Sequence, residues 1–378
     1  MAGPTLADVL ARFGPAYLAA HRLGCEQARV WRAIVTCRTH ALGGQLERCA
    51  CCGAMRHVYH SCRNRHCPQC QRRAKEAWLA ARRRELLPVP YFHLVFTLPH
   101  ALNALAARAP RLIYDTLFAA ASATLNAFAA SARHLGGQSA FSLVLHTWAQ
   151  DLRRHIHVHA LVAGGALSNE GRWAAPRRGF LFPVKALSRV YRGKFIAQLQ
   201  AQPHGLDARA WRALCQRLHA HDWVVYAKQP LGGPEPVLDY LARYTHRVAV
   251  SNERIIGIDG DDVLLRVRSR QAGAERRVVR LSGVEFIARF LAHVLPSGFK
   301  RIRHYGLLAS ACKRTRLGAA RQALGAAQPD PHVIETLVQF LQRIDRLETL
   351  RCPHCGGAFV VLGPLAPTGH PRQARGPP

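Results

Sequence analysis

The chain has 378 residues, of which 49% are hydrophobic, and this is enough apolar content for one large core or for two to three smaller ones. Its 53 lysines and arginines against 22 acidic residues give a formal net charge of +31, which favours a polyanionic partner. The sequence has no run of about eighteen apolar residues and no signal peptide. We therefore expect no membrane partner and expect the protein to reside in a reducing cytosol. A bias in genomic base composition is an alternative source for part of the arginine excess.

The first 87 residues change pattern twice. Apolar residues recur at helical spacing over residues 5–35, with a break at Gly14-Pro15, which predicts two short helices. Residues 37–70 lose this period and are rich in cysteine, arginine, glycine and histidine, which is typical of a small module organised by metal. A basic helix is expected to follow, over about residues 71–87.

Twelve cysteines are present, and eight of them precede residue 71. In a reducing cytosol, thiolate metal sites are favoured over disulfides. Two CxxC pairs separated by fourteen residues stand in CACCGAMRHVYHSCRNRHCPQC (49–70), and this spacing predicts one tetrahedral structural Zn²⁺. The expected ligands are Cys49, Cys52, Cys67 and Cys70. Cys62 is an alternative ligand and, with Cys37, could complete a second centre; free cysteines packed as small hydrophobic residues are the other interpretation.

The cysteine module runs directly into basic sequence. Eight lysines and arginines lie between Arg63 and Arg84 against one acidic residue, Glu76, and a second basic stretch is GFKRIRHYGLLA (298–309). Such surfaces suit the phosphate backbone of DNA, although a solvated helix face beside a purely structural zinc is an alternative. The residues predicted to contact DNA are Arg63, Arg65, Arg72, Arg73, Arg82, Arg83, Arg84, Lys300, Arg301 and Arg303.

The rest of the chain mixes strand and helix patterns. Strands are expected near residues 91–98, 139–148, 155–165 and 223–228, with a hairpin return over 166–173. Helices are expected over 101–133, 184–201, 206–219 and 283–294, with two more before RCPHCGG. Residues 254–282 predict a small β-meander. The domains expected are a helical and zinc-binding DNA-recognition domain (1–88), a catalytic domain (89–310), a C-terminal helical region with a CxxC (311–360) and a disordered tail (361–378).

The stretch RHIHVHA (154–160) places His155, His157 and His159 at every second position. On a strand these imidazoles share one face, while Ile156 and Val158 share the other. Neighbouring histidines on that face have Cα atoms about 7 Å apart, so two of them can reach one cation. Three unrelated surface histidines, in a chain that has 21, are the alternative.

The stretch LDYLARYTHR (238–247) places Tyr240 and Tyr244 on one face of an expected helix. A tyrosine hydroxyl is a poor nucleophile at its usual pKa near 10, but beside a divalent cation that polarises a phosphate it can attack and leave a phosphotyrosine. An aromatic stripe packed in a core is the alternative. Together with the histidines and the positive charge, the pair predicts phosphodiester transfer.

At this point the sequence resembles a known family, the rolling-circle, two-tyrosine HUH (histidine, hydrophobic residue, histidine) transposases of the insertion sequence ninety-one family. CRTHALGG and SCRNRHCPQCQ resemble its N-terminal zinc-binding domain. Four further stretches resemble successive blocks of its transposase domain: YFHLVFTLPH, HTWAQDLRRHIHVHALVAGGALS, YLARYTHRVAVSN and FKRIRHYGLLA. The resemblance implies an α+β fold, with an antiparallel HUH endonuclease-like sheet flanked by helices and an N-terminal helical and zinc-binding module.

The resemblance also implies an activity, in which single-stranded DNA at transposon ends is nicked and joined through a 5′-phosphotyrosine at Tyr240 or Tyr244. His157 and His159 are then the pair that holds Mg²⁺ or Mn²⁺. The candidates for a third ligand are His155, Gln150 and His246. A replication-initiator or relaxase-type nickase and a non-catalytic zinc-containing DNA-binding protein are the alternatives, and a bacterial cytoplasmic, nucleoid-associated location is expected. The final Cys352-Pro-His-Cys355 resembles the C-terminal ends of family members, but a lone CxxC indicates a second zinc only weakly.

Overall fold

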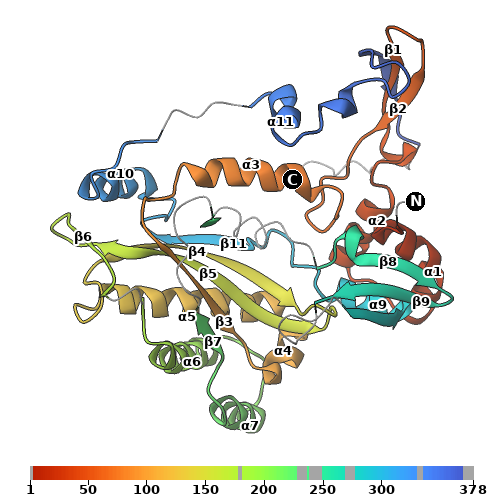
Figure 1. Cartoon of the computed structure of the whole chain (residues 1–378). Coiled ribbons are helices and arrows are strands. Elements are labelled where there is room, and N and C mark those ends of the chain that lie inside the picture. Colours follow the sequence, from red (N-terminus) through yellow and green to blue (C-terminus); the bar gives the residue numbers. More distant parts are fainter. Residues whose placement is uncertain are drawn as a thin grey trace, which may run out of the picture.

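The computed structural model describes residues 3–177, 181–227, 236–237, 249–268, 277–329 and 335–368, without the side chains of residues 71–74, 77 and 337. Within these ranges the chain forms three antiparallel sheets with helices packed on them, an α+β arrangement (Figure 1). The prediction of an antiparallel α+β fold with an N-terminal cysteine cluster is therefore confirmed.

The largest sheet has six strands, in the order β11-β4-β5-β3-β7, with β6 paired to β5. Its strands are β3 (Tyr91–Thr97), β4 (Gln138–Trp148), β5 (Arg154–Leu167), β6 (Trp173–Ala174), β7 (Val225–Ala227) and β11 (Ile302–Gly306). The strands β4 and β5 are long and centrally placed, and they carry the histidine stretch. All their neighbours are antiparallel, so side chains of matched register project together to either face.

One face of this sheet is apolar and buries the main core. Ile156, Val158 and Ala160 of β5 alternate with the histidines and pack in the same cluster as Phe96 of β3. The helices on this face are α4 (Asn103–Arg108), α5 (Pro110–Ala130), α6 (Val184–Gln200) and α7 (Ala208–His219). In the part of the chain that the structure describes, α5 alone has the length and hydropathy of a membrane span, but 61% of its apolar window is buried inside the protein.

The opposite face of the sheet carries the histidines and is partly covered by α3 (Gln71–Arg83) and α10 (Lys313–Ala323). A smaller apolar cluster forms here, in which Leu161 and Ala163 of β5 lie with Leu317 of α10 and with Trp78 of α3 at its edge. The sheet thus has a fully apolar side and a side on which hydrophobic and ionisable groups are mixed.

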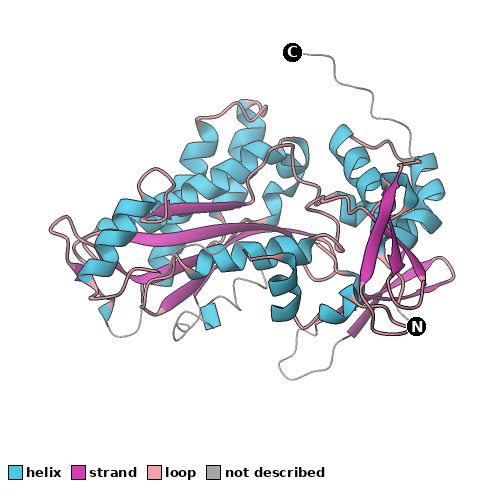
Figure 2. Ribbon diagram, turned by 90° about the horizontal axis from the view of Figure 1, so that it is seen from above, coloured by secondary structure: helices cyan, strands magenta, loops and turns pink. Residues whose placement is uncertain are grey.

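The N-terminal helices α1 (Leu6–Ala20) and α2 (Cys25–Val35) pack on a second sheet, β10-β9-β8. That sheet is formed by β8 (Ile255–Asp259), β9 (Asp262–Val267) and β10 (Arg277–Ser282), and α9 (Gly283–Leu291) follows it. Seen from above, this unit lies at one end of the large sheet (Figure 2). At Gly283 an added Cβ would lie 2.0 Å from the ring of Phe13, so α1 and α9 approach closely only because this residue is glycine.

The third sheet pairs a hairpin from the early part of the chain with a late strand, in the order β12-β1-β2. Its strands are β1 (Gly44–Cys49), β2 (Met55–Tyr59) and β12 (Phe359–Leu365), and α11 (Leu337–Arg343) lies between α10 and β12 in the chain. The hairpin of β1 and β2 therefore acquires its third strand from a segment more than 300 residues away in the sequence, with Gly44 opposite Leu365 and Cys49 opposite Phe359.

Most expected elements are present, and three differ. The expected break at Gly14-Pro15 is wrong: α1 continues through Pro15, because Gly14 lies directly against the ring of Trp31 and packing outweighs the lost hydrogen bond. The sequence pattern does not predict the strands β11 and β12. FKRIRHYGLLA is strongly basic and FVVLGPL contains a proline, and neither feature is typical of a strand. The β-meander over 254–282 and the helices α6 and α7 agree with the sequence pattern.

One polar contact fastens α3 to the sheet. Arg82 donates from Nη1 to Nε2 of His304 (2.7 Å), which leaves Nδ1 of His304 to donate to Oγ of Ser142 (2.7 Å). Burial, the Arg82 charge and the Lys313 charge lower the pKa of His304 to about 4 from the usual 6.5. His304 is therefore neutral at pH 7, and this contact depends on its neutrality.

This contact predicts that the protein loses stability as the pH falls. Below pH 6.5 the unfolded chain binds a proton at residue 304 that the folded chain rejects down to about pH 4, which costs at most about 1.4 kcal/mol for each pH unit in that window. His304→Gln keeps an acceptor for Arg82 and cannot be protonated. We expect the urea midpoint of the variant to fall less between pH 6.5 and pH 4 than that of the wild type, while the exposed His219→Gln on α7 behaves as the wild type. Equal slopes for His304→Gln and the wild type would contradict the assignment.

Candidate functional site

Three imidazoles from two neighbouring strands converge on the mixed face of the large sheet. His157 on β5 lies opposite His146 on β4, and Val144 lies opposite His159, so the register brings the three rings together. Nε2 of His159 is 3.1 Å from Nε2 of His157 and 3.1 Å from Nδ1 of His146. These three nitrogens all lie within 4.8 Å of one another. They form the histidine group of the molecule.

A fourth histidine, on the neighbouring strand β3, contacts His159 of this group. His93 on β3 is buried, and its Nε2 lies 2.9 Å from Nδ1 of His159, with the two rings stacked at 5.1 Å between centroids. If His159 presents a bare Nε2 to a cation, then its Nδ1 carries the proton and donates it to His93. His157 is fixed in a similar way, because its Nδ1 lies 2.9 Å from the carbonyl oxygen of His155 and donates to it.

The environment favours the neutral form of His157. Burial, with a smaller contribution from His155, lowers the pKa of His157 to about 4. Burial and the neighbouring His100 also lower the pKa of His155. A neutral imidazole offers a lone pair, so His157 presents a nitrogen ligand at pH 7 without losing a proton first.

The structure brings some of the predicted metal ligands together and leaves others apart. His157 and His159 lie together, but the third nitrogen comes from His146, which was not among the candidates. His155 is adjacent, with its ring centroid 4.8 Å from that of His157, yet it stands outside the group of three. Gln150 lies in the turn after β4, where its carbonyl oxygen accepts a hydrogen bond from Arg254. His146 is in HTW, an ordinary strand pattern, so only the register of β4 against β5 could identify it.

The remaining catalytic candidates, Tyr240, Tyr244 and His246, lie outside the described residues. The nearest described residue before them is Val237, which is fully buried. It belongs to the apolar cluster that contains Leu161 and Ala163, and these two follow the histidines on the same face of β5.

The cysteines form two groups rather than the single quartet expected. The expected set of Cys49, Cys52, Cys67 and Cys70 is not brought together, because its two CxxC pairs lie in different places. In each group the four sulfur atoms lie within 4.8 Å of one another. The first group is Cys37, Cys62, Cys67 and Cys70. The second group is Cys49, Cys52, Cys352 and Cys355. The strand β2 and the loop after it separate the two N-terminal CxxC pairs. Each pair therefore lies beside cysteines from another part of the chain.

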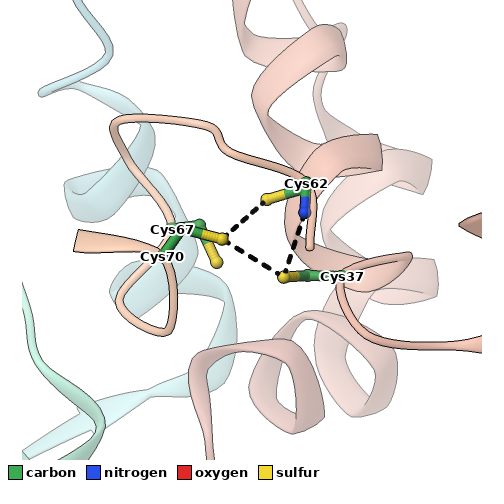
Figure 3. Close-up of side chains that lie close together, drawn as sticks. All are labelled: Cys37, Cys62, Cys67 and Cys70. Carbon is green, nitrogen blue, oxygen red and sulfur yellow. Dashed lines mark hydrogen bonds between the residues drawn. The ribbon is translucent and has the colours of Figure 1, made fainter. Parts of the chain in front are cut away.

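The first group is shown in Figure 3 and lies between the end of α2 and the start of α3. Sγ of Cys70 lies 3.5 Å from Sγ of Cys37 and 3.6 Å from Sγ of Cys62. The edge of a tetrahedron of sulfurs around Zn²⁺ is about 3.8 Å, calculated from Zn–S bonds of about 2.3 Å, so the spacing fits. Backbone N–H groups of Cys62 and Asn64 point at the sulfurs of Cys37 and Cys62, as thiolate charge requires.

The basic residues predicted to contact DNA fall into three sets. Arg63, Arg83 and Lys300 are exposed. Arg65, Arg82, Arg84, Arg301 and Arg303 are half-buried, and the side chains of Arg72 and Arg73 lie outside the described residues.

Several of the half-buried arginines hold the protein together. Arg65 donates to the carbonyl oxygens of Pro296 and Phe299, and Arg303 pairs with Asp115. Burial and the charge of Arg65 lower the pKa of Arg301 to about 10, which still leaves it charged at pH 7. Part of the large positive charge is therefore used within the fold.

Two protein-family models match the sequence. A family model described as a transposase zinc-binding domain matches residues 9–98, and one described as "Putative transposase" matches residues 140–316. The first of these matches and the thiol groups support a structural zinc.

Two curated proteins are similar to the chain over most of its length. It is 44% identical over 389 residues to "Putative transposase y4qJ" of Sinorhizobium fredii (strain NBRC 101917 / NGR234), covering 98% of each chain. It is 26% identical over 346 residues to the transposase for insertion sequence element IS801 of Pseudomonas savastanoi pv. phaseolicola, covering 88% of this chain and 82% of that one.

Two solved structures also match, both of the conjugative relaxase TrwC. One is in complex with mutant OriT DNA (13% identity, 62% of this chain and 74% of that one) and the other is a metal-free structure with OriT DNA (14%, 62% and 72%). Each has a TM-score of 0.23, which supports no conclusion. The 44% identity across nearly the whole of both chains, together with both family models, shows the family to which the chain belongs. The protein belongs to the insertion sequence ninety-one family, the rolling-circle transposases of the HUH type.

Proposed function

We propose that this transposase cleaves and rejoins single-stranded DNA at transposon ends through a 5′-phosphotyrosine link. The observation that carries the proposal is the convergence of ring nitrogens from His146, His157 and His159 on one face of the sheet. Three such ligands on rigid neighbouring strands are suited to hold one divalent cation beside a phosphate.

The spacing of the three nitrogens fits a six-coordinate ion. Adjacent ligands of an octahedral ion with bonds of about 2.1 Å lie about 3.0 Å apart, and the two short nitrogen distances here are 3.1 Å. Mg²⁺ or Mn²⁺ bound there would polarise the scissile phosphate and stabilise the leaving oxygen. Imidazole is a softer ligand than Mg²⁺ prefers, so Mn²⁺ would be the better match, and water and DNA would supply its remaining oxygen ligands.

Tyr240 and Tyr244 are the proposed nucleophiles. The tyrosine hydroxyl loses its proton as Oη forms a bond to the phosphorus, the bond from phosphorus to the 3′ oxygen breaks, and that oxygen gains a proton and leaves as a 3′-hydroxyl. The phosphodiester energy is kept in the covalent link, so rejoining needs no ATP. Val237, the last described residue before the two tyrosines, is buried with Leu161 and Ala163, and this supports the proposal.

The N-terminal module is proposed to bind the DNA backbone. Zn²⁺ at Cys37, Cys62, Cys67 and Cys70 would fix the loop that carries Arg63, and exposed Arg83 and Lys300 offer further phosphate contacts. These cations position DNA without reading its sequence. The place of action that follows is the bacterial cytoplasm, at the nucleoid.

The central prediction is a covalent protein–DNA adduct that depends on the histidine group. The wild type, incubated with Mn²⁺ and a single-stranded transposon-end oligonucleotide labelled at its 3′ end, should give a slow band on a denaturing gel. His146→Ala should reduce the rate of adduct formation at least about 100-fold, because removing a metal ligand removes electrostatic stabilisation of the transition state. The matched control is His219→Ala on the exposed face of α7, which should leave the rate unchanged.

Two outcomes would reject the mechanism. One is an absence of adduct from folded wild type, which leaves a non-catalytic DNA-binding protein. The other is an undiminished adduct from the double variant Tyr240→Phe/Tyr244→Phe, which would place the nucleophile elsewhere. Nicking without any joined product would instead favour an initiator or relaxase-type nickase.

His93 should act by positioning His159. His93→Phe keeps a ring stacked on His159 but removes the acceptor for its Nδ1 proton. Losing such a partner of a metal ligand typically costs about 10–100-fold in metal affinity or activity. We expect the Mn²⁺ concentration for half-maximal adduct formation to rise by about that factor, with His93→Gln recovering part of the loss. A lower rate with an unchanged Mn²⁺ requirement would indicate a purely structural role.

A further inference from the structure

The second thiol group joins two turns that lie far apart in the sequence. Cys49 ends β1 and Cys52 is in the turn after it, whereas Cys352 and Cys355 are in the turn before β12. Sγ of Cys49 lies 3.4 Å from Sγ of Cys355, and Sγ of Cys52 lies 3.6 Å from Sγ of Cys352. Both distances are close to the edge of about 3.8 Å expected for four sulfurs around Zn²⁺.

The two turns have the same hydrogen-bond pattern. In the first, the N–H of Cys49 donates to Ala54 O (2.8 Å) and the N–H of Gly53 donates to Cys49 O (3.1 Å). In the second, the N–H of Cys352 donates to Gly357 O (2.8 Å) and the N–H of Gly356 donates to Cys352 O (2.8 Å). Gly53 and Gly356 both have positive φ, at 76° and 73°. Two copies of one tight turn thus face each other, and each presents two thiols.

The backbone also crowds the sulfurs. A Cβ added at Gly357 would lie 3.1 Å from Sγ of Cys49 and 3.3 Å from Sγ of Cys355, so the chain passes at a distance that suits glycine alone. A disulfide would need sulfurs about 2.05 Å apart, well below the spacing observed. Cys51 lies between two members of the group in the sequence, yet it is exposed and is not part of it.

We propose that Cys49, Cys52, Cys352 and Cys355 bind a second structural Zn²⁺, which fastens the C-terminal segment over the histidine face. Half of this site lies outside residues 9–98, the range matched by the zinc-binding domain. The proposal does not depend on the catalytic mechanism. Its function is mechanical, because the described residues 313–329 and 335–368, which we call the C-terminal strap, are anchored at their far end by the site.

Figure 1 shows α10 near one end of α3 and α11 on the same side of the large sheet as α3. Lys313 pairs with Glu85 (2.5 Å), just after the end of α3, and Arg343 pairs with Glu76 (2.9 Å), in the middle of α3, so the strap is tied to this helix at two places. These two pairs are partly exposed, and pairs of this kind are weak on their own. A metal site that joins residue 49 to residue 355 closes a loop of about 300 residues, which adds a large entropic stabilisation to the strap.

The test is the zinc content of the full-length chain. We expect two zinc ions per wild-type chain by mass spectrometry of the purified, dialysed protein, and one in Cys352→Ser/Cys355→Ser. Cys62→Ser/Cys67→Ser should lose the other ion. Cys51→Ser is the matched control and should keep both. One zinc in the wild type, with no change in Cys352→Ser/Cys355→Ser, would overturn the proposal, as would a disulfide found at these positions under reducing conditions.

Two further measurements guard against general misfolding. Cys52→His replaces one zinc ligand by another and should keep two ions, which a merely structural cysteine would not explain. Limited trypsin digestion should cut the strap near Arg343 and Arg346 at least about tenfold faster in Cys352→Ser/Cys355→Ser, and cleavage within α1 should keep its wild-type rate. Equal strap cleavage in the variant and the wild type would contradict the clamping role.

Discussion

The register between β4 and β5 is the constraint on which the site depends. Because His146 faces His157 across an antiparallel pair, two strands rather than one supply the nitrogens, and the rings meet without any loop having to close over them. The same register turns Ile156 and Val158 into the apolar core. A shift by a single residue would turn the imidazoles toward the apolar core and the hydrophobic residues toward the mixed face, so the folding of the core and the formation of the histidine group are one event.

The charge of the protein is divided between structure and DNA binding. Arg65, Arg82 and Arg303 have carbonyl, histidine or carboxylate partners within the fold, whereas Arg63 and Lys300 face solvent. A net charge of +31 would push a compact chain apart, and partners inside the fold reduce that repulsion locally. Arginine suits both uses, because its planar group can donate several hydrogen bonds from a partly buried position.

Much of the architecture is readable from local sequence, and the parts that are not share one cause. The alternation of RHIHVHA gives both the strand and its two faces, and the CxxC turns identify thiol ligands. His146 and the pairing of Cys49 with Cys355 are not readable, because they depend on which distant strands become neighbours. The continuation of α1 through Pro15 is also decided at a distance, by the fit of Trp31 against Gly14. Local propensity cannot report such contacts.

The sheet β12-β1-β2 has a consequence for how the protein is made. The hairpin of β1 and β2 leaves the ribosome early, but the strand that completes its sheet is among the last described residues of the chain. Since chains fold from the N-terminus during synthesis, β1 has one edge unpaired until β12 has been translated. A product truncated before residue 352 has the histidine strands but cannot close this sheet, so pairing at the free edge of β1 distinguishes chains that have passed this point from chains that have not.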